Sequence, residues 1–402
     1  MASGLIVGME IGTARTVLCA GELDPDRNRV RIVGLQPQPT LGVRKGQVVD
    51  SARALDSVNA VLTAMSNEQN ITVWKMVQVC SGGNIHAVHK DGVLSINNAD
   101  HQVTGDDIAE VSEIVQNRCR EEGHYLLHVL PQGYQLDEQW VSSPVGMNCN
   151  ELRMHMLGIN AESNRIDNMI NVSKSAEIEV TDVVFGGVCA ALSVLTDEQK
   201  RNGVVLIDLG AGTTDYVAYL DGMVATVGSI SVGGDHITND IAIAFNVTNK
   251  RAETLKCEES NALVLPIEKG RERILLRQDL GFEERNINRR SLDTVVNARI
   301  DEILRLVRDR LNEDDVLSQF HGSVVLTGGG AYLKGVTELA SQIFARPCSI
   351  GIPVNVDGLE SVEQPASFAT AAGAVIYGFK SYQRPRVGAQ MLGFIKKIFG
   401  GN

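Results

Sequence analysis

The strongest chemical signal in this sequence is the segment DLGAGTTD at residues 208–215. Asp208 follows an apolar run, so its carboxylate would lie at the tip of a buried strand and could hold Mg²⁺ directly or through a water molecule. The small residues after it let backbone N–H groups turn toward a phosphate without Cβ clashes. The segment predicts a phosphate-binding turn; the alternative is an ordinary hairpin turn with a capping aspartate. The predicted phosphate ligands are Gly210, Ala211, Gly212, Thr213 and Thr214.

A second segment of this kind, EIGTAR, stands at residues 10–15. Thr13 and the backbone of Ala14 suit a terminal phosphate, and Arg15 could neutralise its charge. A solvated surface arginine is the alternative for Arg15. Glu10 is the weaker of two candidate Mg²⁺ ligands, after Asp208. The predicted phosphate ligands of this turn are Gly12, Thr13, Ala14 and Arg15.

Two further segments suit a nucleoside. In LTGGGAYL (residues 326–333), Gly328, Gly329 and Gly330 permit flat backbone contact with a purine. Tyr332 could stack on the base or simply pack in the protein. In AETLK, Glu253 and Lys256 are three residues apart on one predicted helix face, where they could hold a ribose or form a surface ion pair.

The elements that must position these turns repeat along the chain. Residues 4–23 read as strand, small-residue turn and strand, and residues 203–222 repeat that pattern. An internal repeat at this distance predicts an α/β fold of two related halves, with the three turns converging on a cleft between them. Apolar periodicity predicts the main helices over residues 50–65, 104–120, 164–176, 186–195 and 368–382.

The composition excludes several classes of protein. The 402 residues carry a net charge of -12, which argues against general nucleic-acid binding. Seven scattered cysteines without zinc spacing are interpreted as reduced thiols. The N-terminus reads as a buried strand and not as a signal peptide, and no run approaches the roughly 20 apolar residues of a membrane span.

The last twelve residues, MLGFIKKIFGGN, form a short apolar and basic tail after a linker at residues 383–390. On a helix, the apolar side chains fall on one side and the two lysines on the other. This pattern predicts an amphipathic helix over residues 391–402 that binds anionic lipid; a helix docked on the core and a frayed end are the alternatives. The predicted membrane-binding residues are Met391, Leu392, Phe394, Ile395, Lys396, Lys397, Ile398 and Phe399.

Two phosphate turns followed by a triple-glycine turn resemble the actin-like ATPase superfamily. Further segments narrow the resemblance to the bacterial cell division family FtsA, over essentially the whole chain. They are GMEIGTA, HVLPQGYQLD, SPVGM with LRMHM, TNDIAIAF, AETLK, LTGGGAYLKGV and GFIKKIFGGN.

This resemblance implies an actin-like ATPase fold of two related α/β halves around a nucleotide cleft, with an inserted subdomain 1C and a C-terminal amphipathic helix. The implied subdomains are 1A (residues 1–82, 163–202 and the closing helix 361–382), 1C (83–162), 2A (203–229 and 306–360) and 2B (230–305).

The family's activity is likewise an implication of the resemblance. It implies ATP and Mg²⁺ as ligands, self-assembly into filaments on anionic membrane lipid, and tethering of the tubulin-like protein FtsZ through its C-terminal tail, bound at 2B. Other division proteins would bind 1C. The expected location is the cytoplasmic side of the inner membrane, at the septum. Four arginines in 2B could receive an acidic tail or form a solvated face: Arg285, Arg289, Arg290 and Arg299.

Relatives such as MreB carry an acid near the start of the helix after TDVVF, where it orients the attacking water. Here Gly186 and Gly187 stand there, so the resemblance implies a weak ATPase at most, with ATP acting mainly as a conformational ligand. Two alternatives share the superfamily: a small-metabolite kinase, which needs a carboxylate poised on the acceptor hydroxyl, and a pilus-assembly adaptor of the PilM type, which lacks the membrane-binding tail.

Overall fold

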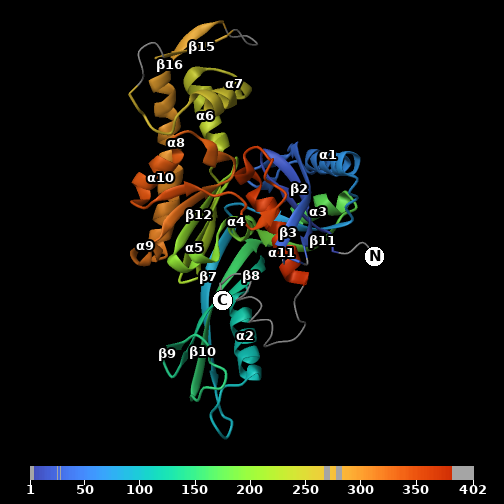
Figure 1. Ribbon diagram of the computed structural model, residues 1–402, viewed down its shortest axis with the longest axis vertical. Helices are drawn as coiled ribbons and strands as arrows, with labels where there is room; N and C mark the ends of the chain where they lie inside the picture. Colours follow the sequence, from blue (N-terminus) through green and yellow to red (C-terminus); the bar gives the residue numbers. More distant parts are fainter. Residues whose placement is uncertain (1–3, 25, 28, 267–271, 278–282, 383–402) are drawn as a thin grey trace.

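The computed structural model describes residues 4–24, 26–27, 29–266, 272–277 and 283–382. Two large sheets stand side by side with helices between and around them (Figure 1). The first has the strand order β11-β6-β1-β2-β3-β19, and the second has the order β18-β17-β12-β13-β14-β7-β10-β8-β9. The strands of the first sheet are β1 (Ile6–Ile11), β2 (Arg15–Asp24), β3 (Arg29–Pro39), β6 (Lys75–Cys80), β11 (Glu179–Phe185) and β19 (Val356–Asp357).

The second sheet contains the repeat of this plan. Its strands from the C-terminal part of the chain are β12 (Val204–Leu209), β13 (Thr214–Leu220), β14 (Met223–Ile230), β17 (Ser323–Thr327) and β18 (Cys348–Ile350). β12 pairs antiparallel with β13 and parallel with β17, just as β1 pairs antiparallel with β2 and parallel with β6. The two halves therefore share one topology, and the prediction of two related α/β halves is confirmed.

Two helices fill the space between the halves. α4 (Gly186–Val194) is buried along its whole length, and α11 (Ala369–Tyr382) packs against α4 and against β1. The Ser193 hydroxyl on α4 donates a hydrogen bond of 2.6 Å to the Ala369 carbonyl at the start of α11. Small side chains (Gly, Ala and Ser) allow these two helices to approach closely, so they pack as a pair between the two sheets.

The other helices cover the outer faces. Around the first sheet lie α1 (Ser51–Gln69) and α3 (Ser163–Ser175). The second half carries α5 (Asp197–Asn202), α6 (Gly234–Phe245), α7 (Asn249–Thr254), α8 (Arg289–Glu313), α9 (Val316–Gln319) and α10 (Val336–Phe344). The structure thus confirms the predicted helices; α1 extends four residues beyond its predicted end, to an Asn70 cap in the left-handed conformation.

Opposite ends of the molecule carry two extensions of the core (Figure 1). One is the insertion at residues 83–162: β7 (Ile85–Ser95), α2 (Gly105–Cys119), β8 (His124–Leu136), β9 (Gln139–Val141) and β10 (Glu151–Glu162). The other contains α6, α7 and the small sheet of β15 (Arg273–Leu276) and β16 (Arg285–Asn288). A second small hairpin, β4 (Val43–Arg44) with β5 (Gln47–Val48), lies in the first half.

The insertion is covalently part of the first half, but its strands extend the sheet of the second. β7 joins β14 through the antiparallel pair His86–Gly228. Beyond it, the Gln132 side chain on β8 donates a hydrogen bond of 2.6 Å to the Val224 carbonyl on β14. On the other side, the Phe185 N–H of β11 donates to His128 Nε2 of β8 at 3.1 Å. The insertion therefore contacts both halves at its root.

Further predictions concern the cysteines, membrane-spanning helices and the C-terminal segment. All seven cysteines are free thiols. Over the described part of the chain, no helix has the length and apolar character needed to cross a bilayer. The linker 383–390 and the amphipathic helix 391–402 lie outside the described residues.

Candidate functional site: a cleft between three glycine turns

All three predicted turns line one cavity of about 430 Å³ between the halves. This volume falls in the range of small-molecule sites. The cavity brings together both candidate metal ligands, the two phosphate turns, the Glu253–Lys256 pair and the triple-glycine turn. The predicted residues that line it are Glu10, Gly12, Thr13, Ala14, Arg15, Asp208, Gly210, Ala211, Gly212, Thr213, Glu253, Lys256, Gly328, Gly329, Gly330 and Tyr332.

The two phosphate turns face each other directly. A Cβ on Gly212 would overlap the Thr13 hydroxyl oxygen of the opposite turn, and would come within 3.0 Å of the Lys45 Cα. Thr13 Oγ1 also accepts a hydrogen bond of 3.2 Å from the Gly46 N–H. Only a residue without a side chain lets the turns approach this closely, so Gly212 sets the distance between the halves at the cleft.

The triple-glycine turn packs on the end of β12. Gly328 has φ +80°, and a Cβ there would overlap the Asp208 carboxylate. The chain then enters a 3₁₀ turn, η2 (Gly329–Tyr332). The Tyr332 hydroxyl accepts a hydrogen bond of 3.0 Å from the Ala366 N–H, which holds this turn against the segment before α11. Tyr332 therefore packs in the protein through its hydroxyl while it also lines the cavity.

Three carboxyl groups gather where β1, β12 and β13 end. Burial raises the pKa of Asp208, although the Thr370 hydroxyl donates to its Oδ2 at 2.6 Å. Burial, followed by the neighbouring Asp208 carboxylate, raises the pKa of Glu10 from 4.5 to about 8. The same two causes raise the pKa of Asp215 to about 7, although the Ser229 hydroxyl donates to it at 2.5 Å.

This carboxyl cluster (Glu10, Asp208 and Asp215) fits a divalent cation. Burial and mutual repulsion raise the pKa values of these carboxyl groups, and a divalent cation bound among them would relieve both effects. Hard oxygen ligands of this kind are the ones that Mg²⁺ prefers. Glu10, Asp208 and Asp215 could therefore hold a divalent cation in the cavity.

Arg15 brings positive charge to the same cavity. Its guanidinium carbon lies 5.1 Å from the centre of the Phe368 ring, and its charge counteracts part of the rise in the Glu10 pKa. The side chain is half-buried and lines the cavity, so it is not the solvated surface arginine of the alternative interpretation.

The Glu253–Lys256 pair lies at the rim of the cavity. Lys256 Nζ is 2.7 Å from Glu253 Oε2, and it also donates to Thr238 Oγ1 at 2.9 Å. Burial works to raise the pKa of Glu253, but the Lys256 charge and the donors around the carboxylate outweigh it and lower that pKa. The lysine side chain is 14% exposed and the glutamate side chain 49%, so the two form an ion pair that is partly buried at the rim of the cavity. It spans the junction of α7 with the π-helical turn η1 (Leu255–Glu259), a conformation found mostly at functional sites.

Thr214 is a correction to the sequence analysis. It is fully buried as the first residue of β13, and its hydroxyl donates a hydrogen bond of 2.9 Å to the Val232 carbonyl. Its hydroxyl is thus bonded to a carbonyl that follows β14, and Thr214 is not among the residues that line the cavity. The turn therefore offers one threonine hydroxyl, that of Thr213.

Several lining residues were not among the predicted ligands. Gly233 and Gly234 begin α6, whose first N–H groups bond the Gly210 and Ala211 carbonyls at 2.9 and 2.8 Å. Ser81 and Thr370 contact the carboxyl cluster. Glycine-rich signals do stand at SGG (81–83) and VGGD (232–235). Thr370 had no such signal, because it reaches Asp208 from α11, 162 residues away.

The start of α4 lies beside the carboxyl cluster. A Cβ on Gly186 would come within 3.1 Å of Asp215 Oδ2. The helix places Gly186 and Gly187 there, so it offers no acid side chain to a water molecule near the phosphates.

The predicted arginine face in residues 230–305 is largely occupied by partners within the chain. Arg299 bonds Asp240 at 2.6 Å, Arg289 bonds Glu259 at 2.6 Å, and Arg285 donates to the Asn246 carbonyl at 2.9 Å. Arg290 is exposed on the first turn of α8. An acidic partner would therefore have to replace some of these internal contacts.

Comparison with known proteins gives two matches to family models. One, described as "Cell division protein FtsA", matches residues 205–373. The other, described as "SHS2 domain inserted in FTSA", matches residues 82–160, within two residues of each end of the predicted insertion.

The chain is 30% identical to the cell division protein FtsA of Pseudomonas aeruginosa over 94% of its own length and 89% of that protein. It is 29% identical to FtsA of Escherichia coli K12 over 98% of this chain and 96% of that protein.

Solved structures agree on the fold. The PilM–PilN type IV pilus biogenesis complex matches with a TM-score of 0.65 and 16% identity, over 93% of this chain and 98% of that one. MreB 5 of Spiroplasma citri bound to AMPPNP matches with a TM-score of 0.54 and 16% identity, over 95% and 97%. At this identity the likeness concerns architecture alone, and it confirms the actin-like fold.

Proposed function

The chain belongs to the FtsA family of cell division proteins, and we propose from this premise that it is an ATP-dependent filament protein that tethers the division ring to the membrane. The observation that carries the proposal is the convergence of three glycine turns from both halves on one cavity that holds a buried carboxyl cluster. A ligand bound there contacts both halves at once, so its presence changes how they are held together.

The residues fit ATP with Mg²⁺. The turns at residues 12–15 and 210–213 would receive the phosphates, and Arg15 would neutralise part of their charge. Glu253, Lys256 and the triple-glycine turn would receive the nucleoside. Asp208 would hold Mg²⁺ directly or through water, with Glu10 and Asp215 beside it. When bound, the ion supplies the positive charge that the phosphates and these carboxylates both need.

The same site favours slow hydrolysis. Gly186 and Gly187 provide no general base at the start of α4. Asp215 lies nearby, but its carboxylate accepts hydrogen bonds from Ser229 and Ser81 and serves the cation. ATP then acts mainly as a ligand that stabilises the closed, polymerising conformation.

The tail would connect this cleft to the membrane. The twelve residues 391–402 carry a basic and apolar pattern in a chain of net charge -12, so the tail reverses locally the repulsion of the body by anionic lipid. A helix this short binds weakly alone, but a filament with many copies binds firmly through avidity. The protein would therefore sit peripherally on the cytoplasmic face of the inner membrane, at the septum.

The two extensions of the core would bind the partners. The region of α6, α7, β15, β16 and α8 would receive the C-terminal tail of FtsZ, with Arg290 already exposed and the other arginines exchanging their internal partners. The insertion would receive later division proteins, and neighbouring copies of this chain would form the filament.

Co-sedimentation with vesicles of anionic lipid tests the tether. The full chain with ATP and Mg²⁺ should pellet with vesicles, and a chain lacking residues 391–402 should stay in the supernatant. Phe394→Glu should also abolish pelleting and leave ATP binding intact, since residue 394 belongs to the tail and not to the cleft. Unchanged pelleting of the truncated chain would overturn the tether, and joint loss of ATP binding would mean that the tail belongs to the core.

The two alternatives make different predictions. A small-metabolite kinase would transfer the γ-phosphoryl group of ATP to an acceptor, so a screen of sugars and carboxylic acids should yield phosphorylated product. A pilus-assembly adaptor would bind its partner without lipid, and removal of residues 391–402 would change nothing. The family membership and the basic tail favour the tether over both.

A further inference from the structure

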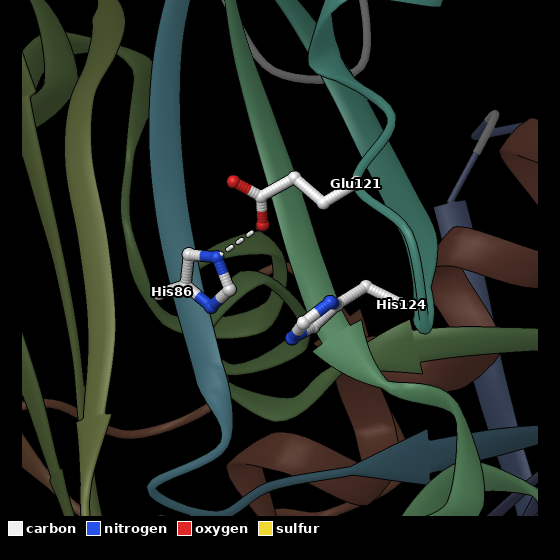
Figure 2. A group of neighbouring side chains, drawn as sticks. All are labelled: His86, Glu121 and His124. Carbon is white, nitrogen blue, oxygen red and sulfur yellow. Dashed lines mark hydrogen bonds and ion pairs between the residues drawn. The ribbon is translucent and has the colours of Figure 1, made fainter.

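Three side chains at the root of the insertion form a cluster outside the cleft (Figure 2). His86 comes from β7, Glu121 from the connection after α2, and His124 from the first position of β8. One ligand atom of each lies within 4.8 Å of the others, in a search of the described residues. None of the three has a role in the function proposed above.

The topology of the insertion explains why these residues meet. His86 pairs with Asn160 of β10, and His124 pairs with Glu162 of the same strand. Residues two apart on a strand share a face, so both imidazoles lie on one face of the sheet. α2 covers that face, since the Asn160 side chain donates to the Cys119 carbonyl at the end of α2 at 2.9 Å. Glu121 follows that helix end and reaches the same place.

The turn that carries two of the groups is held in position. The His124 N–H donates to the Glu121 carbonyl at 3.2 Å, which closes a tight turn with Gly123 at φ +74°. The Ser163 N–H donates to the Gly123 carbonyl at 2.9 Å and ties the turn to the start of α3. Backbone hydrogen bonds therefore fix the positions of Glu121 and His124 in this turn.

The hydrogen bonds of the rings leave nitrogen lone pairs for a metal. His124 Nδ1 is 3.0 Å from the Glu122 carbonyl oxygen, which can only accept, so Nδ1 carries the hydrogen and neutral Nε2 is free to ligate. Metal-binding histidines commonly donate their second nitrogen to a carbonyl in this way. His86 Nε2 lies 2.6 Å from Glu121 Oε2. The two rings stand edge to face, 5.3 Å apart.

We propose that His86, Glu121 and His124 form a Zn²⁺ site, with water completing a tetrahedral shell. Two imidazoles, one carboxylate and a water are an established zinc ligand set. Bond lengths of about 2.0 Å place tetrahedral ligands about 3.3 Å apart. Rotamer adjustments would close the wider gaps of up to 4.8 Å, and the ion would replace the hydrogen between His86 Nε2 and Glu121 Oε2 and widen their 2.6 Å separation. The His86 and Glu121 side chains are 43% and 36% exposed, so an ion can enter from solvent.

The site has a structural consequence at the root of the insertion. His86 is the residue through which β7 pairs with Gly228 of β14 in the second half. An ion held by His86, Glu121 and His124 would join β7 to the start of β8 directly beside that pair. Zinc would thus stiffen the root on which the insertion meets the second half.

Zinc titration of the full, tag-free chain tests the proposal. After treatment with a chelator and desalting, isothermal titration with zinc sulfate should show one saturable site. His86→Ala and His124→Ala should each weaken zinc binding about 100-fold or more, since the loss of a group that only orients a metal ligand already costs 10- to 100-fold. His321→Ala, which removes an exposed histidine in the second half, is the matched control and should leave binding unchanged.

Further readouts separate ligation from folding. Co²⁺ in the same site should give the visible absorption of a four-coordinate ion, and that spectrum should disappear in the variants. Zinc should raise the melting temperature of the wild-type chain and not that of His86→Ala. Glu121→Gln, a near-isosteric change, serves if an alanine variant fails to fold.

Two results would overturn the site. Saturable binding that survives the joint loss of His86 and His124 would place the ion elsewhere, and Cys257→Ser would then show whether that exposed thiol holds it. Absence of saturable binding in the wild-type chain would reduce the cluster to a histidine–glutamate ion pair.

Discussion

The two hairpins at the cleft match residue for residue, yet they carry different chemistry. In the first hairpin Ile11 pairs with Thr16, and in the second Leu209 pairs with Thr214, so the loops have equal length. The equivalence extends outward: Glu10 faces Val17 across the first hairpin, and Asp208 faces Asp215 across the second. The first hairpin thus brings one carboxyl group to the cleft and the second hairpin brings two.

The two hairpins also differ in positive charge, since only the first carries an arginine in its turn. Arg15 of the first turn occupies the position of Thr213 in the second. Ala14 of the first turn is exposed, whereas its counterpart Gly212 touches the opposite turn. The repeated backbone therefore supplies two similar turns that differ in a few side chains: the second hairpin carries Asp208 and Asp215, and the first carries Glu10 and Arg15.

The largest expected effect comes from Gly212→Ala, which gives the second turn the methyl group that the first already has at Ala14. The new Cβ would overlap Thr13, so the halves would have to separate. Overpacking of this kind costs about 1–3 kcal/mol, which predicts ATP binding about 10- to 100-fold weaker in a calorimetric titration. Thermal unfolding controls for loss of fold. Wild-type affinity would show that the turns stand further apart in solution.

A smaller effect is expected from Asp215→Asn. This change removes a charge from the second hairpin and makes it more like the first, where the uncharged Val17 stands at the equivalent position. Loss of one carboxylate beside Asp208 should weaken the Mg²⁺-dependent part of ATP affinity about tenfold, or about 1.4 kcal/mol. Titrations with Mg²⁺ and with EDTA measure that part. Asp221→Asn, at the far turn of the same strand, is the matched control. Equal losses with and without Mg²⁺ would assign Asp215 a role in packing only.

The last effect concerns the dependence of the free energy of unfolding on pH. Glu10 and Asp215 hold their protons more tightly in the folded chain, with pKa values of about 8 and about 7 against 4.5 and 3.8. The folded state therefore binds more protons than the unfolded state in this window, and its free energy of unfolding should fall as pH rises toward 8. Each carboxyl group contributes at most about 1.4 kcal/mol per pH unit.

Melting temperatures of the ligand-free chain between pH 6 and 8 measure this slope, at about 2–4 °C per kcal/mol for a large domain. Glu10→Gln removes one titrating group of the first half and should flatten the slope; Glu22→Gln, an exposed change on the same hairpin, should not. An unchanged slope in Glu10→Gln would mean that Glu10 ionises normally.

Much of this cleft follows from local pattern. The two hairpin turns can be predicted from DLGAGTTD and EIGTAR because strand, glycine turn and strand are adjacent in the chain. The starts of helices can also be predicted from local sequence. The side chains of Thr104 and Asp107, for example, form the capping box that begins α2. The conformation of such turns and helix starts is determined by residues a few positions away in the sequence.

What could not be predicted depends on distant contacts. From the sequence Thr214 is predicted to be a phosphate ligand, but the segment between β14 and α6 places the Val232 carbonyl beside its hydroxyl. Thr370 reaches Asp208 only through the packing of α11. His86 and His124 are 38 residues apart by their numbering, and only their common neighbour β10 reveals that they meet. No local pattern encodes these approaches, because each depends on how separate elements pack.

The insertion's double attachment gives it a mechanical role. The chain enters and leaves it through the first half, yet β7 pairs with β14 of the second, so a pull on the insertion loads both halves together. From β7 the load crosses β14 and β13 to reach β12, a path of about 14 Å at about 4.8 Å per strand, and β12 ends at the phosphate turn. Tension on the far tip of the insertion would therefore reach the turn at residues 210–213 and change the width of the cleft.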